Sequence, residues 1–505
     1  MPISFNRIPS NWKVPLYWVE VDPSKAGLPI NQQNVLLVGV QLTATAKATV
    51  NVPIAIASQA QADYQFGQGS QLANMFKAYL ANNFVGSVYG LPVVEGSAAA
   101  VGTVTVSTPP TVAGTFHLYI HGVHVGVNVG ATDTVTVVAA AIAAAITANK
   151  DLMVSATPAV GVVTLTCKGK GVYGNDIILS DNYFGAIGSE VMPTGMTVVY
   201  AAMASGAGVP TFTTAISNLG ENEYEHVVIP YTDATSLTAW ETEYGFSDTG
   251  RWGWVRQHYG HLWSAARGTM TTVNALAVAR NCAQLSIMGV ELLAQSHVHS
   301  WAAAYAGKAA RGYLNDPARP LQSLHLEGII PAPMQSRYLL SELNNMSLSG
   351  VATQRVPDQT NVPMIARETT TYTLNLYGAS DDAYDVATTL ATLARILRNQ
   401  RQAITSKYPR HKLADDGTRF GAGQAIVTPK IVKAELVSQY RIDEFNGLVE
   451  NGTAFKNALI VERDSNDPNR MNVLYPPDLV NGLRVFAVLA QFRLQFNRGV
   501  DLAII

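Results

Sequence analysis

The feature that most constrains the fold is a mainly apolar run, NVLLVGVQL, between Asn34 and Leu42. An uninterrupted run of this kind is typical of a strand that is covered on both faces. A helix is indicated next, because Ser70 is suited to an N-cap and apolar residues then recur at helical spacing. These residues are Leu72, Met75, Phe76, Tyr79 and Leu80. A buried strand followed by an amphipathic helix predicts an α/β layer.

The α/β pattern is interrupted between residues 96 and 205, where Gly, Thr, Val and Ala dominate and charges are sparse. The stretch TFHLYIHGVHVGVNV alternates on both sides of Gly122, which predicts a hairpin. An Ala-rich helix and the strand GVVTLTC are expected after it. We therefore predict a small β-rich domain with one helix, inserted into the α/β domain and placed on its outside.

The α/β pattern resumes near residue 206, with a strand at HVVIP and a helix that is capped near Asp233 or Ser236. Helices are also predicted within 380–404 and from Thr428–Pro429, where a capping Thr precedes a Pro in the first turn. The predicted fold class is a multidomain mixture of α/β and α+β. The expected division is an N-terminal arm (1–24), a first part of the α/β core (25–95), the inserted domain (96–205), a second part of the core (206–365) and a C-terminal α+β domain (366–505).

Both chain ends show the period-two alternation of a strand. VPLYWVEV (14–21) is isolated between prolines, and LRVFAVLAQFRLQF (483–496) has one continuous apolar face. Apolar strands are unusual at chain ends, which are normally polar and frayed. Because unpaired backbone groups are costly away from water, each strand requires a partner.

The composition restricts the classes of function. The formal net charge of −2 argues against a nucleic-acid-binding protein, which needs a basic field. Charged residues make up 14% of the chain, below the roughly 25% of typical soluble domains. This suggests that neighbouring molecules cover much of the surface, although large cores give the same composition. We expect no membrane insertion, because the most apolar run, VVAAAIAAAI, is half of what a bilayer requires. Two widely spaced cysteines and no signal-peptide pattern fit maturation in a reducing cytosol.

Histidine pairs are the first candidates for chemistry. His297 and His299 would share one side of a strand and offer two metal ligands, but no third ligand is indicated nearby. His117 and His121 flank Tyr119 on one strand face, where a polar hairpin face is the favoured interpretation.

Acidic loops are the second candidates. Asp415 and Asp416 suit general acid–base work, but Asp-Asp-Gly is also a common turn. DSNDPNR (464–470) lacks EF-hand spacing, so a turn is favoured over a calcium loop. No Walker loop, GxSxG or HExxH motif occurs. We predict a non-enzyme with no catalytic, cofactor-binding or metal-binding residue.

Several stretches, in order along nearly the whole chain, resemble the contractile tail sheath proteins of Mu-like myoviruses. They include ISFNRIPSNWKVPLYWVEVD, ASQAQADYQFGQGSQLANMFKAYLANN, EHVVIPYTDATSL, RWGWVRQHYGHLWSAARGT, DPARPLQSL, KYPRHKLADDGTRFGAGQAIVTP and GLVENGTAFKNALIVERDSNDPNRMNVLYPPDLVNGLRVFA. No single stretch is a mechanistic motif; their number and order carry the resemblance.

The resemblance implies a structural role in a virion tail that is assembled in the host cytoplasm. Subunits would form six-membered rings, stack helically around the tail tube protein, and contract to drive the tube through the host envelope. Baseplate and tail terminator proteins are the other implied partners. The terminal arms would cross between subunits and complete a shared β-sheet. The residues expected in these arms are Leu16, Trp18, Val19, Val21, Phe486, Val488, Phe492 and Leu494.

Arg395, Arg398 and Arg401 are candidates for an electrostatic contact with the tube, although a solvated helix face or an intersubunit salt bridge is the favoured alternative. Three rival functions remain open. The chain would serve equally in a phage-tail-like bacteriocin or another contractile injection system. A rival of another class is a hydrolytic enzyme on the α/β part, which predicts a deep polar pocket. The third is a β-rich glycan-binding protein, suggested by residues 96–205.

Overall fold

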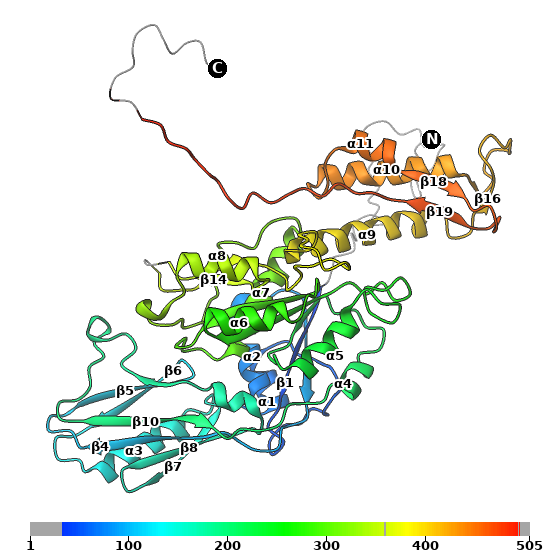
Figure 1. Cartoon of the computed structure of the whole chain (residues 1–505). Helices are drawn as coiled ribbons and strands as arrows, with labels where there is room; N and C mark the ends of the chain where they lie inside the picture. Colours follow the sequence, from blue (N-terminus) through cyan, green and yellow to red (C-terminus); the bar gives the residue numbers. More distant parts are fainter. Residues whose placement is uncertain (1–32, 358–359, 493, 495–505) are drawn as a thin grey trace, which may run out of the picture.

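A six-stranded sheet lies at the centre of the computed structural model, which describes residues 33–357, 360–492 and 494 (Figure 1). The strand order is β13-β12-β11-β1-β3-β2, and every neighbouring pair is parallel except β2 with β3. The strands are β1 (Asn34–Val40), β2 (Ile54–Ala55), β3 (Ser87–Val93), β11 (His226–Val228), β12 (His261–Gly268) and β13 (Leu285–Glu291).

Helices cover both faces of this sheet, which confirms the predicted α/β core. Successive residues of β1 point to opposite faces, so Leu36 and Val38 enter one hydrophobic cluster while Val35 and Leu37 enter the other. One face carries α1 (Gln59–Phe66), α2 (Gln71–Asn82) and α7 (Val298–Asn315). The other carries α4 (Thr213–Ser217), α5 (Ala234–Tyr244), α6 (Met270–Val278) and α8 (Leu340–Leu348), and a short 3-10 turn, η4 (Met334–Ser336), precedes α8.

Local signals set the ends of these helices as predicted. The Ser70 hydroxyl accepts a hydrogen bond from the Ala73 amide at 3.0 Å and caps α2. Asp233 caps α5 in the same way, through the Ser236 amide at 2.9 Å. Strand and helix also approach closely at Gly90 of β3, where a Cβ atom would lie 2.3 Å from the ring of Phe66. This approach explains a glycine in the middle of a buried strand.

The insertion consists of two antiparallel sheets and a helix, as predicted (Figure 1). The sheets have the orders β10-β4-β8-β7 and β6-β5-β9, and α3 packs on the first sheet and on β6. The elements are β4 (Val101–Thr108), β5 (Gly114–Ile120), β6 (Val123–Val129), α3 (Val135–Ala148), β7 (Val154–Ala159), β8 (Val162–Cys167), η2 (Val172–Asp176), β9 (Leu179–Asp181), η3 (Ala186–Gly188) and β10 (Thr197–Ala204).

The insertion is firmly attached to the core. The chain enters and leaves it at adjacent points, since Ala98 and Ala207 form an isolated antiparallel bridge. Arg267, at the end of β12, donates to the Asp176 carboxylate at 2.5 Å and to the Ala294 carbonyl, also at 2.5 Å. Asp176 also accepts from the first amide of α7, that of Val298, at 3.0 Å. Because one hydrophobic cluster runs from the core into the insertion, the two parts share an interior.

The C-terminal part is joined to the core by the long helix α9 (Ala387–Lys407), which starts on the core and ends beside α10 (Figure 1). Thr428 precedes α10 and Pro429 occupies its first turn, as predicted, but the Thr428 side chain does not cap it. Asp416 accepts from the Lys430 amide at 3.1 Å instead. The remaining elements are β14 (Thr353–Arg355), β15 (Met364–Arg367), β16 (Lys412–Leu413), β17 (Ile426–Val427), α10 (Pro429–Phe445), α11 (Gly452–Ala458), β18 (Ile460–Arg463) and β19 (Met471–Leu474).

The two predicted terminal strands have different outcomes. The N-terminal strand, 14–21, with Leu16, Trp18, Val19 and Val21, lies outside the described residues. The prediction of a strand at 483–496 that pairs within its own C-terminal domain is wrong for the described residues, because 483–492 are extended but belong to no sheet. No helix in the described part has the length and apolar character that crossing a membrane requires.

Candidate functional site

An incomplete sheet at the tip of the C-terminal part is the first component of the site. β18 and β19 pair antiparallel, with Ile460 opposite Leu474 and Val461 opposite Val473. In the described part of the chain this sheet has two strands, so each strand has an outer edge without a partner. Ile460, Val473 and Leu474 are exposed. A two-stranded sheet with apolar residues in water is marginal and gains from a third strand.

The C-terminal segment is the second component. Figure 1 shows it leaving the C-terminal helices and running away from the rest of the molecule. Within the described residues, 485–492 make no backbone hydrogen bond. Its large apolar side chains are almost fully exposed, with Phe486 at 82%, Phe492 at 86% and Leu494 at 98%. Val488 is also exposed. The segment therefore presents backbone groups without a partner in the described residues, together with an apolar surface.

An ion pair fixes the point at which this segment leaves the body. Arg484 donates to both carboxylate oxygens of Glu368, at 3.0 and 2.6 Å. Glu368 is fully buried and also accepts from the Thr388 hydroxyl at 2.5 Å. Burial alone would raise the pKa of Glu368, but the hydrogen bond and charge of Arg484 hold it below its ordinary value. The sequence gives no signal for this pair, whose members lie 116 residues apart.

Arg398, one of the three arginines proposed to face a tube, is instead engaged within the chain. It forms an ion pair with Glu223, lies 3.5 Å from Glu225, and stacks over the ring of Tyr259 at 5.7 Å. Through these contacts it fastens α9 to the core edge that leads into β11. This salt bridge lies within one chain, whereas the sequence analysis favoured a solvated helix face or a salt bridge between subunits.

The other two arginines differ in exposure. Arg395 is partly buried, and both burial and the charge of Arg398 lower its pKa. Arg401 is exposed and borders a groove of about 690 Å³ between α9 and β19. Of the three arginines, Arg401 is therefore the one whose side chain is exposed on the surface of the chain.

A small cavity lies where α9 meets the core. It has a volume of about 40 Å³ and is lined by Glu225, His226, Tyr313 and Arg395, among others. Burial raises the pKa of Glu225 to about 7, although the nearby charge of Arg398 opposes the shift. This cavity has space for little more than a water molecule or two.

His297 and His299 begin a helix, so the predicted shared strand face is wrong. His297 is the N-cap residue of α7, and its ring accepts from the His299 amide at 3.2 Å. The other ring nitrogen of His297 lies 2.8 Å from the Tyr173 carbonyl. Both side chains are fully buried, and burial lowers the pKa of each ring. The two residues are part of the packing between the insertion and the core.

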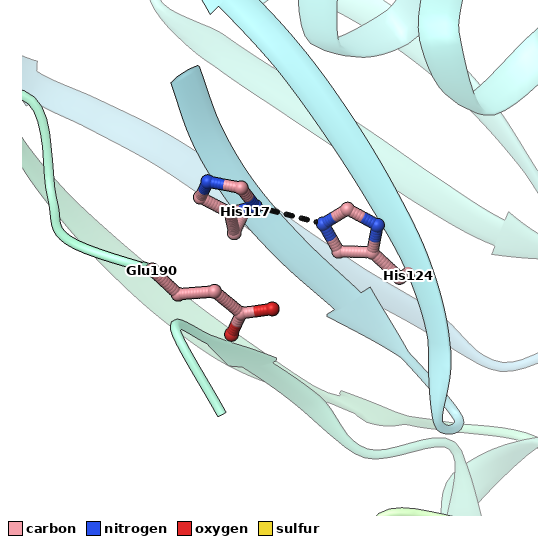
Figure 2. Close-up of side chains that lie close together, drawn as sticks. All are labelled: His117, His124 and Glu190. Carbon is pink, nitrogen blue, oxygen red and sulfur yellow. Dashed lines mark hydrogen bonds between the residues drawn. The ribbon is translucent and has the colours of Figure 1, made fainter. Parts of the chain in front are cut away.

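His117 does lie on a polar hairpin face, but its neighbour is His124 and not His121. His121 follows β5 in the turn, with a φ of 43°. The rings of His117 and His124 are 2.9 Å apart between Nδ1 and Nε2, and Figure 2 shows the Glu190 carboxylate beside them. A ligand atom of each of these three residues lies within 4.8 Å of the others. The sequence analysis missed His124 and Glu190, which come from β6 and from the loop after η3.

The acidic loops are structural. Asp416 caps α10, and Asp415 lies 3.1 Å from Arg463. The Asp464 carboxylate accepts from the amides of Asn466 and Asp467, at 2.8 and 3.0 Å, which confirms a turn in DSNDPNR. The first two acids therefore do not form the pair that general acid–base work requires.

Comparison with known proteins covers most of the chain. Residues 205–371 match the model of the phage tail sheath protein central domain, and residues 379–493 match that of the phage tail sheath C-terminal domain. A Mu-like prophage tail sheath protein (FluMu) from Haemophilus influenzae is 40% identical over 97% of this chain and 100% of its own length. A sheath tail protein structure from Desulfitobacterium hafniense covers 92% of this chain and 100% of its own, at 12% identity and a TM-score of 0.47. One from Listeria innocua covers 89% of this chain and 92% of its own, at 10% identity and a TM-score of 0.48.

Proposed function

The chain belongs to the phage tail sheath family and is a structural subunit of a contractile tail, and from this premise we propose that its copies are linked into a helical sheath by exchanging extended backbone. The segment 485–494 of one copy adds a strand to the open edge of the β18–β19 sheet of another. The N-terminal strand, 14–21, is the second linking arm.

The observation that carries this proposal is the match between the two components of the site. One is a two-stranded sheet with unpaired edges, and the other is an exposed, extended apolar segment without backbone partners. Added strands are held by backbone hydrogen bonds, each contributing roughly 0.5–1.5 kcal/mol net. Burial of a phenylalanine side chain adds about 1.5–3 kcal/mol. Four or five bonds and two such side chains together contribute a free energy of the size needed to offset the loss of freedom on association.

The assembly that follows from this link is open-ended. Donor and acceptor are different surfaces, so the contact is head-to-tail, and it grows an open helical lattice when the rotation between subunits does not close a ring. We infer six-membered rings that stack around the tail tube protein, with baseplate and terminator proteins at the two ends and assembly in the host cytoplasm. Contraction would rotate and shift the subunit bodies while the strand links hold. The extended lattice would persist by kinetic trapping until the baseplate triggers it.

The tube contact remains a proposal with one favoured residue. Arg401 is exposed, whereas Arg398 is held by Glu223 and Arg395 is partly buried. No catalytic step or cofactor enters the proposed mechanism. A phage-tail-like bacteriocin or another contractile injection system would use the same subunit in the same way, and the genes beside this one distinguish these settings.

Negative-stain microscopy tests the proposal. We expect tubes or stacked rings from the full-length protein. We expect monomers from variants that lack residues 1–21 or residues 485–505, each with an unchanged circular dichroism spectrum. If both truncated proteins polymerise as well as the full chain, strand exchange is not what links the subunits.

A further inference from the structure

We propose that His117, His124 and Glu190 bind one divalent transition-metal ion, Zn²⁺ by the chemistry of the ligands, which fastens the loop between β9 and β10 to the β5–β6 hairpin. The proposal is independent of strand exchange. It departs from the sequence analysis, which expects no metal site in this chain.

The hairpin register places the two imidazoles on one face. Tyr119 is opposite His124, and His117 is opposite Gly126, so the histidines are diagonal neighbours. Their rings stack at 5.1 Å between centroids, and His117 Nδ1 lies 2.9 Å from His124 Nε2. Glu190 comes from a different segment, after η3, and Figure 2 shows its carboxylate directed toward the space beside the rings.

The separations are close to those that one ion requires. Zn²⁺ holds imidazole nitrogens and carboxylate oxygens at about 2.0–2.2 Å, so the ligand atoms of one tetrahedral site lie about 3.3–3.6 Å apart. In the structure a ligand atom of each residue lies within 4.8 Å of the others, and the two nitrogens are 2.9 Å apart. Binding would replace the hydrogen bond between the two rings and would require side-chain rotations that bring the three atoms to the metal spacing. Because His124 is exposed, a fourth position would be open to solvent.

The surroundings of Glu190 support a bound cation. Its side chain is buried, yet no Lys or Arg in residues 33–357 and 360–492 forms an ion pair with it. Buried carboxylates are normally paired with a cation or bound to a metal. One oxygen accepts from the Tyr119 hydroxyl and the other from the Phe184 amide at 2.9 Å. Each oxygen keeps a second lone pair for a metal, and these hydrogen bonds would orient the carboxylate as an outer shell does.

The ligand set and the loop define what the ion would do. Two imidazoles and one carboxylate suit Zn²⁺ and its neighbours in the first transition row, whereas Mg²⁺ and Ca²⁺ prefer oxygen alone. The loop that carries Glu190 also exposes Phe184, Ile187 and Val191. A metal cross-link would hold this apolar loop in one position on the hairpin.

Cobalt binding provides a direct test. Full-length protein without a polyhistidine tag is treated with chelator and then titrated with Co²⁺, whose visible ligand-field bands report nitrogen and oxygen ligands. We expect one Co²⁺ per chain, displaced by one Zn²⁺, and protection of the 184–191 loop from proteolysis by Zn²⁺. His124→Ala and Glu190→Gln should each weaken binding at least about tenfold, because even outer-shell changes cost 10–100-fold.

Two control variants separate this site from other binding. Asn128→Ala changes an exposed polar residue on the same face of β6, and His411→Ala removes a histidine of the C-terminal part; both should bind as the wild type does. Circular dichroism checks that each variant is folded. The proposal is overturned if the wild type binds less than one equivalent, or if Glu190→Gln and His124→Ala bind as tightly as the controls.

Discussion

Arg484 donates hydrogen bonds to both carboxylate oxygens of the buried Glu368, at 3.0 and 2.6 Å, immediately before the chain leaves the body of the molecule. The pair sets the direction in which the C-terminal segment departs. A segment that is anchored at its base and free beyond it is ordered in part before it meets a partner, which lowers the entropy cost of binding.

Removing one member of this pair should be costly. Arg484→Met leaves a buried carboxylate without its cation, and we expect about 3 kcal/mol of destabilisation, seen as faster amide exchange in 476–484. The double variant Arg484→Met, Glu368→Gln should recover much of the loss, because no unpaired charge remains. Equal exchange in the wild type and Arg484→Met would show that the pair does not anchor the segment.

The same pair should respond to acid. Because Arg484 holds the pKa of Glu368 below 4.5 in the folded state, the stabilisation is complete above the ordinary value and is lost as the pH falls through the lowered one. Thermal unfolding measured from pH 6 to pH 3 should therefore show an acid loss that Glu368→Gln reduces. An identical acid profile for that variant would contradict the assignment.

The apolar face of the terminal segment should control polymerisation. Replacing Phe486 and Phe492 by serine removes about 3 kcal/mol or more of burial between subunits, which should raise the critical concentration for tubes about a hundredfold. The matched control, Ala487→Ser with Gln491→Ser, changes the opposite side of the same strand and should polymerise nearly normally. Sedimentation across a concentration series measures the critical concentration of both double variants. Equal increases in the two variants would rule out a strand that buries only one face between subunits.

The junction between α9 and the core should become less stable as the pH rises through about 7. Burial raises the pKa of Glu225 to about 7, so its contribution to stability is present below its ordinary 4.5 and is lost as the pH rises through about 7. The loss is at most about 3 kcal/mol. Melting curves from pH 5 to pH 8 should show it in the wild type and not in Glu225→Gln. Arg398→Met, which removes the opposing positive charge, should move the transition to higher pH.

The attachment of the insertion to the core should depend on the guanidinium group of Arg267. Arg267 donates to both oxygens of Asp176 and to backbone carbonyls, a set of contacts that one ammonium group does not reproduce. We expect Arg267→Lys to cost about 2–3 kcal/mol and to speed amide exchange in 172–181. Arg410→Lys, at an exposed position, serves as the control. If amide exchange at 172–181 in Arg267→Lys equals that in the control, the shared hydrophobic interior is sufficient to hold the insertion without the Arg267 contacts.

Elements with a strong local pattern are predictable from this sequence. β1, α2 with its Ser70 cap, and the β5–β6 hairpin form where periodicity and capping indicate, because each pattern is specified within a few residues. Residues of the site that pair over long distances are not predictable. Arg398 and Glu223 are 175 residues apart, and no local signal joins them.

Two errors have the same physical origin. Alternation at 483–496 specifies a chain suited to a strand, but it does not specify a partner, and none of the described strands pairs with residues 483–492. At Thr428 the sequence predicts a cap, yet Asp416, brought close by the loop before β17, takes that role. In both cases tertiary neighbours decide what local propensity leaves open.

The unmatched edges of the β18–β19 sheet have a consequence for length. If each copy adds its own C-terminal segment to the sheet edge of the next copy, a row of identical copies can be extended without limit. The two extremities of such a row differ chemically. One extremity presents an unpaired edge of the β18–β19 sheet, and the other presents an unpaired C-terminal segment. Proteins that bind the two extremities would therefore need different surfaces, and this link by itself sets no limit on the number of copies.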